Sequence, residues 1–152
     1  MATRVITGTD ELKSLVGEHL GYSDYMEITQ ERVNKFADAT GDHQWIHVDP
    51  ERAKDGPFGT TIAHGYLTLS LCVPLMSRTL GLTGYRMGIN YGVNRVRFPA
   101  PLPSGSRIRG RFTVQSVDEV EGGEQGVVLA TIEREGADKP VCVAELVVRM
   151  MR

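Results

Sequence analysis

The chain has 152 residues, of which 41% are apolar, and a formal net charge of −2. This length is typical of one domain, and the apolar fraction suffices for one substantial core, so residues 1–152 are expected to form a single domain. No run of lysine or arginine stands out, which argues against nucleic acid or an anionic membrane as a partner. No window approaches the roughly 18 apolar residues of a membrane span, and the first residues lack the apolar core of a signal peptide. A cytoplasmic location is therefore expected, with Cys72 and Cys142 as free thiols in apolar surroundings.

The first third of the chain predicts two helices and a strand. A short helix is expected over residues 10–16, which Gly17 can end, and a strand over residues 22–28. From Thr29 onward, apolar residues recur at helical spacing until Gly41, which predicts the best-defined helix of this half. The segment after Gly41 therefore begins where a helix stops.

One apolar helix and a set of strands are expected to make up the rest. Residues 48–61 contain prolines and glycines and predict a loop, with one helical turn after Pro50. Residues 66–82 are apolar nearly all round, so they predict a helix buried on most sides, which Pro74 kinks or divides in two. Turn residues separate β-rich runs over residues 85–98, 106–117, 126–135 and 140–150. Together these elements predict an α+β fold in which an antiparallel sheet curls around one long buried helix.

Asp42 and His47 are the residues whose spacing and type most clearly indicate chemistry. A neutral imidazole and an ionised carboxylate that share a water can orient it, remove its proton and return a proton elsewhere. Each such role is typically worth about 10²–10⁴ in rate. The two side chains can meet only if the segment between them is curved, because they would diverge on a regular helix and alternate faces on a strand. The alternative is that Asp42 is a turn residue after a helix and His47 a buried, hydrogen-bonded histidine.

A metal site is the other chemistry that this region could support, because imidazole and carboxylate suit zinc and iron. The glutamate-bearing helical zinc motif is absent, and His43 and His47 could act as a ligand pair only if residues 43–47 were helical. We therefore expect no metal. The residues considered as ligands are His43, His47, Asp49 and His64.

Gly65 stands at the predicted start of the apolar helix. Its N–H would be unsatisfied, would lie at the positive end of the helix dipole, and would have no side chain blocking the approach of a ligand oxygen. Stabilisation of a developing enolate oxygen by such a donor is worth about 2.7–4 kcal/mol. The alternative is a glycine required only for tight packing of the helix on the sheet.

Three groups of residues resemble the MaoC-like, (R)-specific enoyl-CoA hydratases of the hot-dog fold, and the resemblance covers most of the chain from about residue 20 onward. They are Ala-Thr-Gly-Asp at 39–42 with Ile-His-Val-Asp-Pro at 46–50, Phe-Gly-Thr-Thr-Ile-Ala-His-Gly at 58–65, and Asn-Tyr-Gly at 90–92 with Arg-Phe-Pro-Ala-Pro at 97–101. Gln44 and Trp45 stand where the family usually has asparagine and proline, a variant that is similar to a nodulation-protein-N-like subgroup. The departure leaves the acid and base in place and bears on substrate length.

The resemblance implies reversible addition of water across a trans-2-enoyl-CoA to give the (3R)-hydroxyacyl-CoA, without metal or redox cofactor. It implies that Asp42 and His47 are catalytic and that Gly65 supplies the oxyanion N–H. It also implies a homodimer joined edge to edge, which agrees with the need of a small curled sheet to cover its edge. The alternatives are a (3R)-hydroxyacyl-ACP dehydratase of fatty-acid synthesis, a hot-dog thioesterase, and a non-catalytic acyl-CoA-binding or scaffold subunit.

Overall fold

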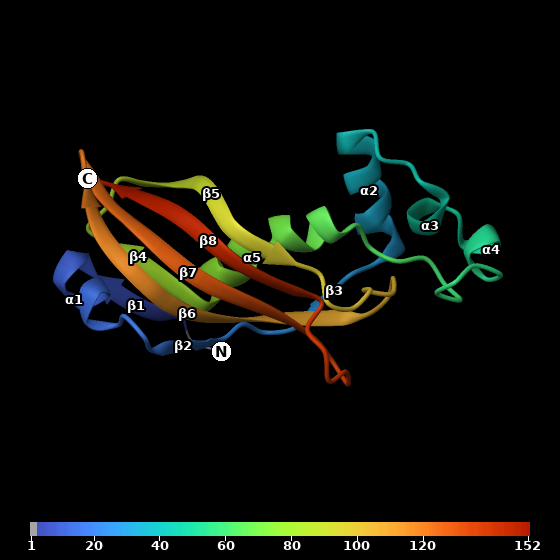
Figure 1. The fold of residues 1–152 in the computed structure, drawn as a ribbon, viewed down its shortest axis with the longest axis horizontal. Helices are drawn as coiled ribbons and strands as arrows, with labels where there is room; N and C mark the ends of the chain where they lie inside the picture. The colour runs from blue at the N-terminus through green and yellow to red at the C-terminus, as the bar shows by residue number, and fades with distance from the viewer. Residues whose placement is uncertain (1–2) are drawn as a thin grey trace.

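A computed structural model describes residues 3–152 and shows one curled antiparallel sheet with a long helix against it (Figure 1). The helix, α5, spans Gly65–Thr79 and contacts strands on the sheet. A short strand, β3 (Met26–Glu27), pairs with the first part of β6. The other strands of this sheet lie side by side in the order β2 (His19–Tyr22), β6 (Arg107–Val120), β7 (Gly123–Arg134), β8 (Cys142–Met151) and β5 (Met87–Arg97). The expected α+β architecture is confirmed, and the four long predicted strands correspond to β5 through β8 with shifted ends.

Alternating burial along β6 explains how the sheet and α5 fit together. Ile108, Phe112 and Val114 point to the interior and are at most 1% exposed. Gly110 lies between them, and a Cβ at this position would come within 2.4 Å of the Phe112 ring. A bare glycine therefore leaves room for the Phe112 ring, which belongs to the same core cluster as Leu75 of α5.

The apolar segment forms one helix and then a strand, and the predicted extension of the helix to residue 82 is wrong. Pro74 lies inside α5, which continues past it to Thr79 without dividing. The chain then forms β4 (Leu80–Thr83), which pairs in parallel with β1 (Arg4–Thr7). Burial of α5 is also one-sided, because Tyr66 on its outer face is 71% exposed.

The predicted strand over residues 22–28 is interrupted, whereas the helix after it is confirmed. The chain leaves the sheet between β2 and β3, where Ser23 exchanges two hydrogen bonds with the backbone of Gly110. Helix α2 spans Gln30–Thr40, and the Thr29 side chain caps it by accepting from the N–H of Arg32. The short N-terminal helix, α1, spans Gly8–Ser14 and so begins two residues earlier than predicted.

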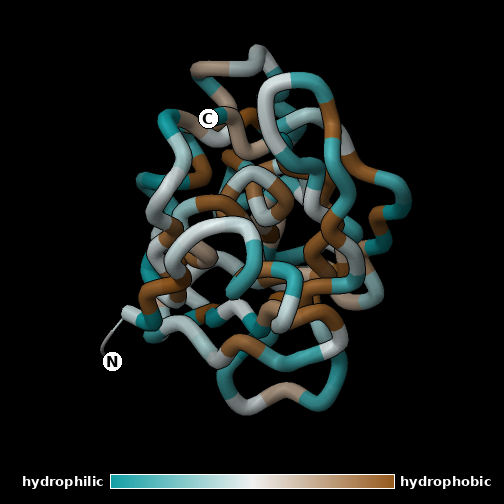
Figure 2. Tube along the Cα trace, turned by 90° about the vertical axis from the view of Figure 1, so that its left-hand side faces the viewer, coloured by the Kyte–Doolittle hydropathy of each residue, from teal (hydrophilic) through white to brown (hydrophobic). Residues whose placement is uncertain are grey.

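Apart from α5, the helices lie at the two ends of the molecule. Figure 1 shows α2, α3 (Trp45–Val48) and α4 (Pro50–Ala53) beyond one end of the sheet, and α1, β1 and β4 at the other. Figure 2 looks at the molecule from the α1 end and shows hydrophobic and hydrophilic stretches alternating along the trace. Both cysteines are free and buried, as expected. Within residues 3–152, no helix has the length and apolar character needed to cross a membrane.

Candidate active site

The end of α2 delivers Asp42 to the site. Gly41 ends the helix in the left-handed conformation, with φ of 83°, which a residue with a side chain rarely adopts. The Asp42 carboxylate then lies at the surface with its side chain 54% exposed. Its own N–H donates to the Thr40 hydroxyl over 3.3 Å, and its Oδ1 accepts from the N–H of Gln44 over 3.4 Å. Both contacts are long, so neither of them fixes the Asp42 carboxylate firmly.

The buried His47 is held in one tautomer by the backbone. Its Nδ1 lies 2.7 Å from the carbonyl oxygen of Ile62, and a carbonyl can only accept, so Nδ1 carries the proton. Nε2 is therefore left with a lone pair that can accept a proton. The main chain of His47 is fixed as well, because the Gln30 side chain donates to its carbonyl oxygen over 2.7 Å.

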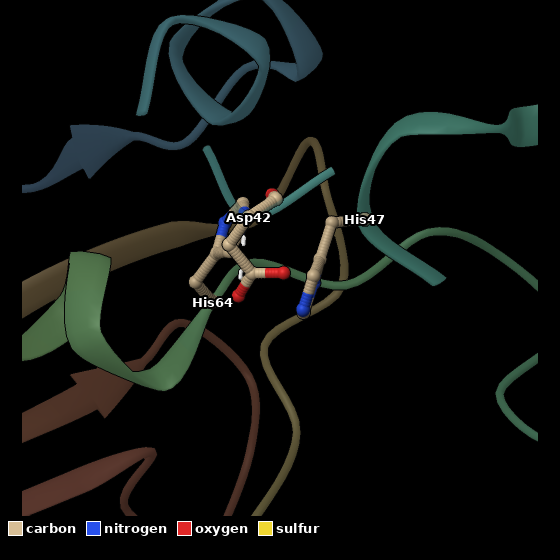
Figure 3. A group of neighbouring side chains, drawn as sticks. All are labelled: Asp42, His47 and His64. Carbon is tan, nitrogen blue, oxygen red and sulfur yellow. Dashed lines mark hydrogen bonds and ion pairs between the residues drawn. The ribbon is translucent and has the colours of Figure 1, made fainter. Parts of the chain in front are cut away.

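A third side chain, His64, joins this pair (Figure 3). Its ring stacks on that of His47 with centroids 3.8 Å apart and planes at 23°. Its Nε2 lies 2.9 Å from the carbonyl oxygen of Asp42 and 3.9 Å from the carboxylate Oδ2 of the same residue. One carboxylate oxygen of Asp42 and one ring nitrogen from each histidine lie within 4.8 Å of one another. From the sequence, His64 was a candidate only as a metal ligand. Its contacts with both Asp42 and His47 were not predicted.

The structure thus brings Asp42 and His47 together, as their prediction as an acid–base pair requires. The segment between them is curved, because the backbone is extended at Gln44 and then forms the single helical turn of α3. Burial lowers the pKa of His47, and the neighbouring His64 lowers it further. The hydrogen bond to Ile62 and the charge of Asp42 act in the opposite direction. Because the net shift is downward, the neutral, proton-accepting form of His47 is favoured at neutral pH.

Gly65 occupies the first position of α5, as predicted. Its N–H belongs to the first turn, which has no intrahelical acceptor, and the preceding His64 provides no side-chain cap. A Cβ at Gly65 would lie 3.0 Å from ring carbons of Phe98, which follows β5. The glycine therefore fits both the oxyanion role and the alternative of tight packing. Phe98 had no signal in the sequence beyond membership of a family motif.

Two apolar cavities lie along α5. The larger, of about 530 Å³, is beside its last turns, and Val73, Met76, Leu80 and Val148 contribute to its wall. The smaller, of about 310 Å³, is beside its first turn, and its lining includes Phe58, Ile62, Gly65, Thr68 and Phe98. The smaller cavity adjoins the donor of Gly65 and the carbonyl that orients His47.

The four residues considered as metal ligands do not gather in one place. His43 is exposed and pairs with Asp38 over 2.9 Å, which holds its pKa above the ordinary value. Asp49 caps α4 by accepting from the N–H of Arg52. In the cluster that does form, Nε2 of His64 donates its proton to a carbonyl and so offers no lone pair to a cation.

Trp45 organises the loop after the site. Its half-buried ring lies under the guanidinium of Arg52, 4.3 Å from the ring centroid, and against Gly56. A Cβ at Gly56 would lie 3.0 Å from the Trp45 ring, so this glycine permits the contact. Trp45 thus holds α4 and the following turn beside the site.

A helix against a curled antiparallel sheet, with an imidazole–carboxylate pair beside the helix start, defines a hot-dog protein equipped for acid–base chemistry. Residues 11–137 match the model described as the MaoC like domain, so the chain belongs to this family.

Named relatives agree with this membership. The chain is 53% identical over 147 residues to 3-hydroxyacyl-thioester dehydratase Z of Mycobacterium tuberculosis, covering 96% of this chain and 97% of that protein. It is 44% identical over 138 residues to nodulation protein N of Rhizobium leguminosarum bv. viciae, covering 88% and 85%. The solved (R)-hydratase from A. caviae involved in PHA biosynthesis matches with a TM-score of 0.71 and 24% identity, covering 88% and 94%. The predicted hot-dog fold and family are confirmed, and a hydratase or dehydratase activity is supported.

Proposed function

We propose that the protein is an (R)-specific enoyl-CoA hydratase, which adds water reversibly across trans-2-enoyl-CoA to give (3R)-hydroxyacyl-CoA. The observation that carries the proposal is the closeness of Asp42 and His47, since a carboxylate oxygen of one and a ring nitrogen of the other lie within 4.8 Å. The hydrogen bond from Nδ1 of His47 to the backbone leaves its Nε2 with a free lone pair. Asp42 and His47 are the catalytic residues in this account, and Gly65 binds the substrate oxygen.

The chemistry needs a bound water between Asp42 and His47. Nε2 of His47 accepts a proton from this water as its oxygen bonds to C3 of the enoyl group. The electron pair of the C2–C3 double bond moves toward the thioester carbonyl, whose oxygen gains negative charge and is stabilised by the N–H of Gly65. A proton then passes to C2 from the pair, which restores the thioester and leaves a hydroxyl group on C3. Dehydration is the same sequence in reverse, and neither direction requires a metal or a redox cofactor.

The apolar cavities support an acyl thioester as the substrate. The smaller cavity adjoins Gly65 and is lined almost entirely by apolar side chains and backbone. The relative named 3-hydroxyacyl-thioester dehydratase Z supports the same class of substrate without specifying the carrier. For this reason a (3R)-hydroxyacyl-ACP dehydratase is the second candidate, with the same residues acting on a thioester of a carrier protein.

We further propose that the protein acts as a homodimer in the cytoplasm. Strand β5 is the edge of the sheet, and it is exposed along nearly its whole length. The exposed side chains on it include Met87, Ile89, Tyr91 and Val93, a long apolar edge that an isolated protein rarely leaves uncovered. Pairing of β5 with its symmetry copy would cover this edge and the outer face of α5.

The test is hydration of crotonyl-CoA by the purified protein, followed as loss of the enoyl-thioester absorbance, with chiral analysis of the product and an assay for free thiol. The proposal expects (3R)-hydroxybutyryl-CoA and no thiol. Turnover of crotonyl-ACP but not crotonyl-CoA would favour the carrier-protein dehydratase, and release of thiol would indicate a thioesterase. Binding of acyl-CoA without turnover would indicate the scaffold subunit.

A further inference from the structure

His64 is anchored firmly by its backbone. It is 3% exposed and is the N-cap of α5, where its carbonyl oxygen accepts from the N–H groups of Leu67 and Thr68 over 3.1 and 3.2 Å. The preceding N–H, that of Ala63, donates to the carbonyl of Leu102 over 2.8 Å. The backbone of His64 is therefore part of the rigid unit that also carries Gly65.

Asp42, in contrast, makes only long hydrogen bonds within its own loop. The contacts within its own loop measure 3.3 and 3.4 Å, at the outer limit of a hydrogen bond. The hydrogen bond from Nε2 of His64 to the carbonyl oxygen of Asp42 is 2.9 Å long and comes from a side chain 22 residues away. It is the shortest hydrogen bond that the structure gives to Asp42.

The ring of His64 makes this hydrogen bond at a cost in stability. Its Nδ1 is buried and has no hydrogen-bond partner in the part of the chain that the structure describes. Its ring stacks on that of His47, with centroids 3.8 Å apart, and contacts the tilted ring of Phe36, with centroids 4.9 Å apart. An apolar ring would make both contacts without leaving a buried nitrogen unpaired. What the imidazole adds is the N–H that reaches Asp42.

We propose that His64 is a positioning residue, which fixes the Asp42 carboxylate relative to His47 and to the Gly65 N–H. This inference rests on the proposed function and extends it to a third side chain. One imidazole links the loop that carries the carboxylate to the first turn of the helix that binds the thioester oxygen. Displacement of a reacting group by about 1 Å can cost on the order of 10²-fold in rate, so the link matters for turnover more than for folding.

Two substitutions of His64 distinguish the role of its side-chain N–H from that of its aromatic ring. His64→Phe keeps an aromatic ring against His47 and Phe36 but has no donor, whereas His64→Gln loses the stack and retains a side-chain N–H that can reach the carbonyl of Asp42. For crotonyl-CoA, we expect His64→Phe to lower kcat about 10- to 100-fold with KM within about threefold, and His64→Gln to recover most of the loss. A matched control, His43→Phe, changes an exposed histidine in the same loop and should leave kcat unchanged.

The pH profile is a further readout that a purely structural role would not move. The groups that face His47 are Asp42, the Ile62 carbonyl and His64, and of these His64 lowers the pKa of His47. Removing the imidazole in either variant should therefore shift the acid limb of kcat/KM toward higher pH. The His43→Phe control should keep the wild-type profile.

Backbone NMR of the substrate-free protein tests the positioning without relying on activity. We expect the heteronuclear NOE of the Asp42, His43 and Gln44 amides to fall in His64→Phe and to stay near wild type in His64→Gln. If His64→Phe folds poorly, His64→Met replaces it, because methionine fills irregular apolar space and also lacks a donor.

The outcomes distinguish this inference from the proposed function. A wild-type protein that hydrates no acyl thioester would refute the function, and the NMR comparison would still decide the role of His64. Wild-type kcat together with unchanged loop order in His64→Phe or His64→Met would overturn the positioning role. Equal losses in the Phe and Gln variants would overturn it as well, because they would show that the N–H is not what matters.

Discussion

Nδ1 of His47 donates to the carbonyl oxygen of Ile62 over 2.7 Å, and this one hydrogen bond decides which nitrogen of the imidazole is basic. Ile62 lies in the segment that leads into α5, which begins at Gly65, so the residue that orients the proposed base is close in sequence to the proposed oxyanion donor. The free Nε2 is consequently available to the water that Asp42 would share. The reaction we propose depends on this geometry more than on the basicity of His47 or the acidity of Asp42.

The lowered pKa of His47 predicts an active enzyme in mildly acidic solution. Burial is the largest cause of the shift, and the neutral form is the one that accepts a proton from water. kcat/KM for crotonyl-CoA should therefore fall only as pH drops below the ordinary histidine value of 6.5. A pH–rate profile between pH 4.5 and 8 measures this midpoint, and a midpoint above 6.5 would contradict the assignment of His47 as the base.

The same shift predicts how stability changes with pH. The pKa of His47 is lower in the folded protein than in the unfolded chain. At a pH between these two values, the unfolded chain binds more protons at this histidine than the folded protein does. The free energy of unfolding should therefore decrease as pH falls from 6.5 through the lower folded-state pKa. Urea unfolding of wild type and His47→Gln at pH 7.5 and 5.5 tests this, since the variant should lose less stability on acidification.

Substitution of Gly65 distinguishes its two possible roles. Gly65→Ala should lower kcat by about 10²–10³, as loss of an oxyanion donor does, because the methyl group obstructs the approach to the N–H. The methyl group would also meet the Phe98 ring at 3.0 Å. Phe98→Ala removes that clash, so the double variant should regain stability and remain slow. Recovery of kcat in the double variant would mean that Gly65 serves only packing.

The exposed edge of β5 predicts the oligomeric state. Val93→Asp places a charge in the middle of the proposed dimer edge and should convert the dimer to a monomer, measured by light scattering coupled to size exclusion. Val16→Asp is the matched control, because Val16 is equally exposed at 44% and lies outside this strand. A wild-type protein that elutes as a fully active monomer would contradict the proposed dimer.

Much of the fold could be predicted because local signals agree with the final packing. Thr29 caps α2 and Gly41 ends it, as their residue types and spacing indicate. The long strands were recognisable from β-rich runs between turns. By contrast, the parallel pairing of β1 with β4 joins residues 4 and 80, and nothing local to Leu80 indicates that a partner strand stops the helix there.

The candidate site was predictable in its residues but not in its geometry. Asp42, His47 and Gly65 were identified from residue type, spacing and family resemblance. The stacking of His64 on His47 was not predictable, because it brings the helical turn of α3 against the segment just before α5. The contact of Phe98 with Gly65 likewise joins residues from distant parts of the chain.

The most direct test of the account is a double-mutant cycle on kcat with Asp42→Asn and His47→Gln. The control is Asp38→Asn, which alters an exposed carboxylate paired with His43 and should have no effect. If the two residues activate one water, each single variant should lose about 10²–10⁴ in kcat, and the double variant should be little worse than either. Independent, multiplicative losses would show that the two side chains do not act on a common water, and wild-type turnover in both single variants would refute the mechanism.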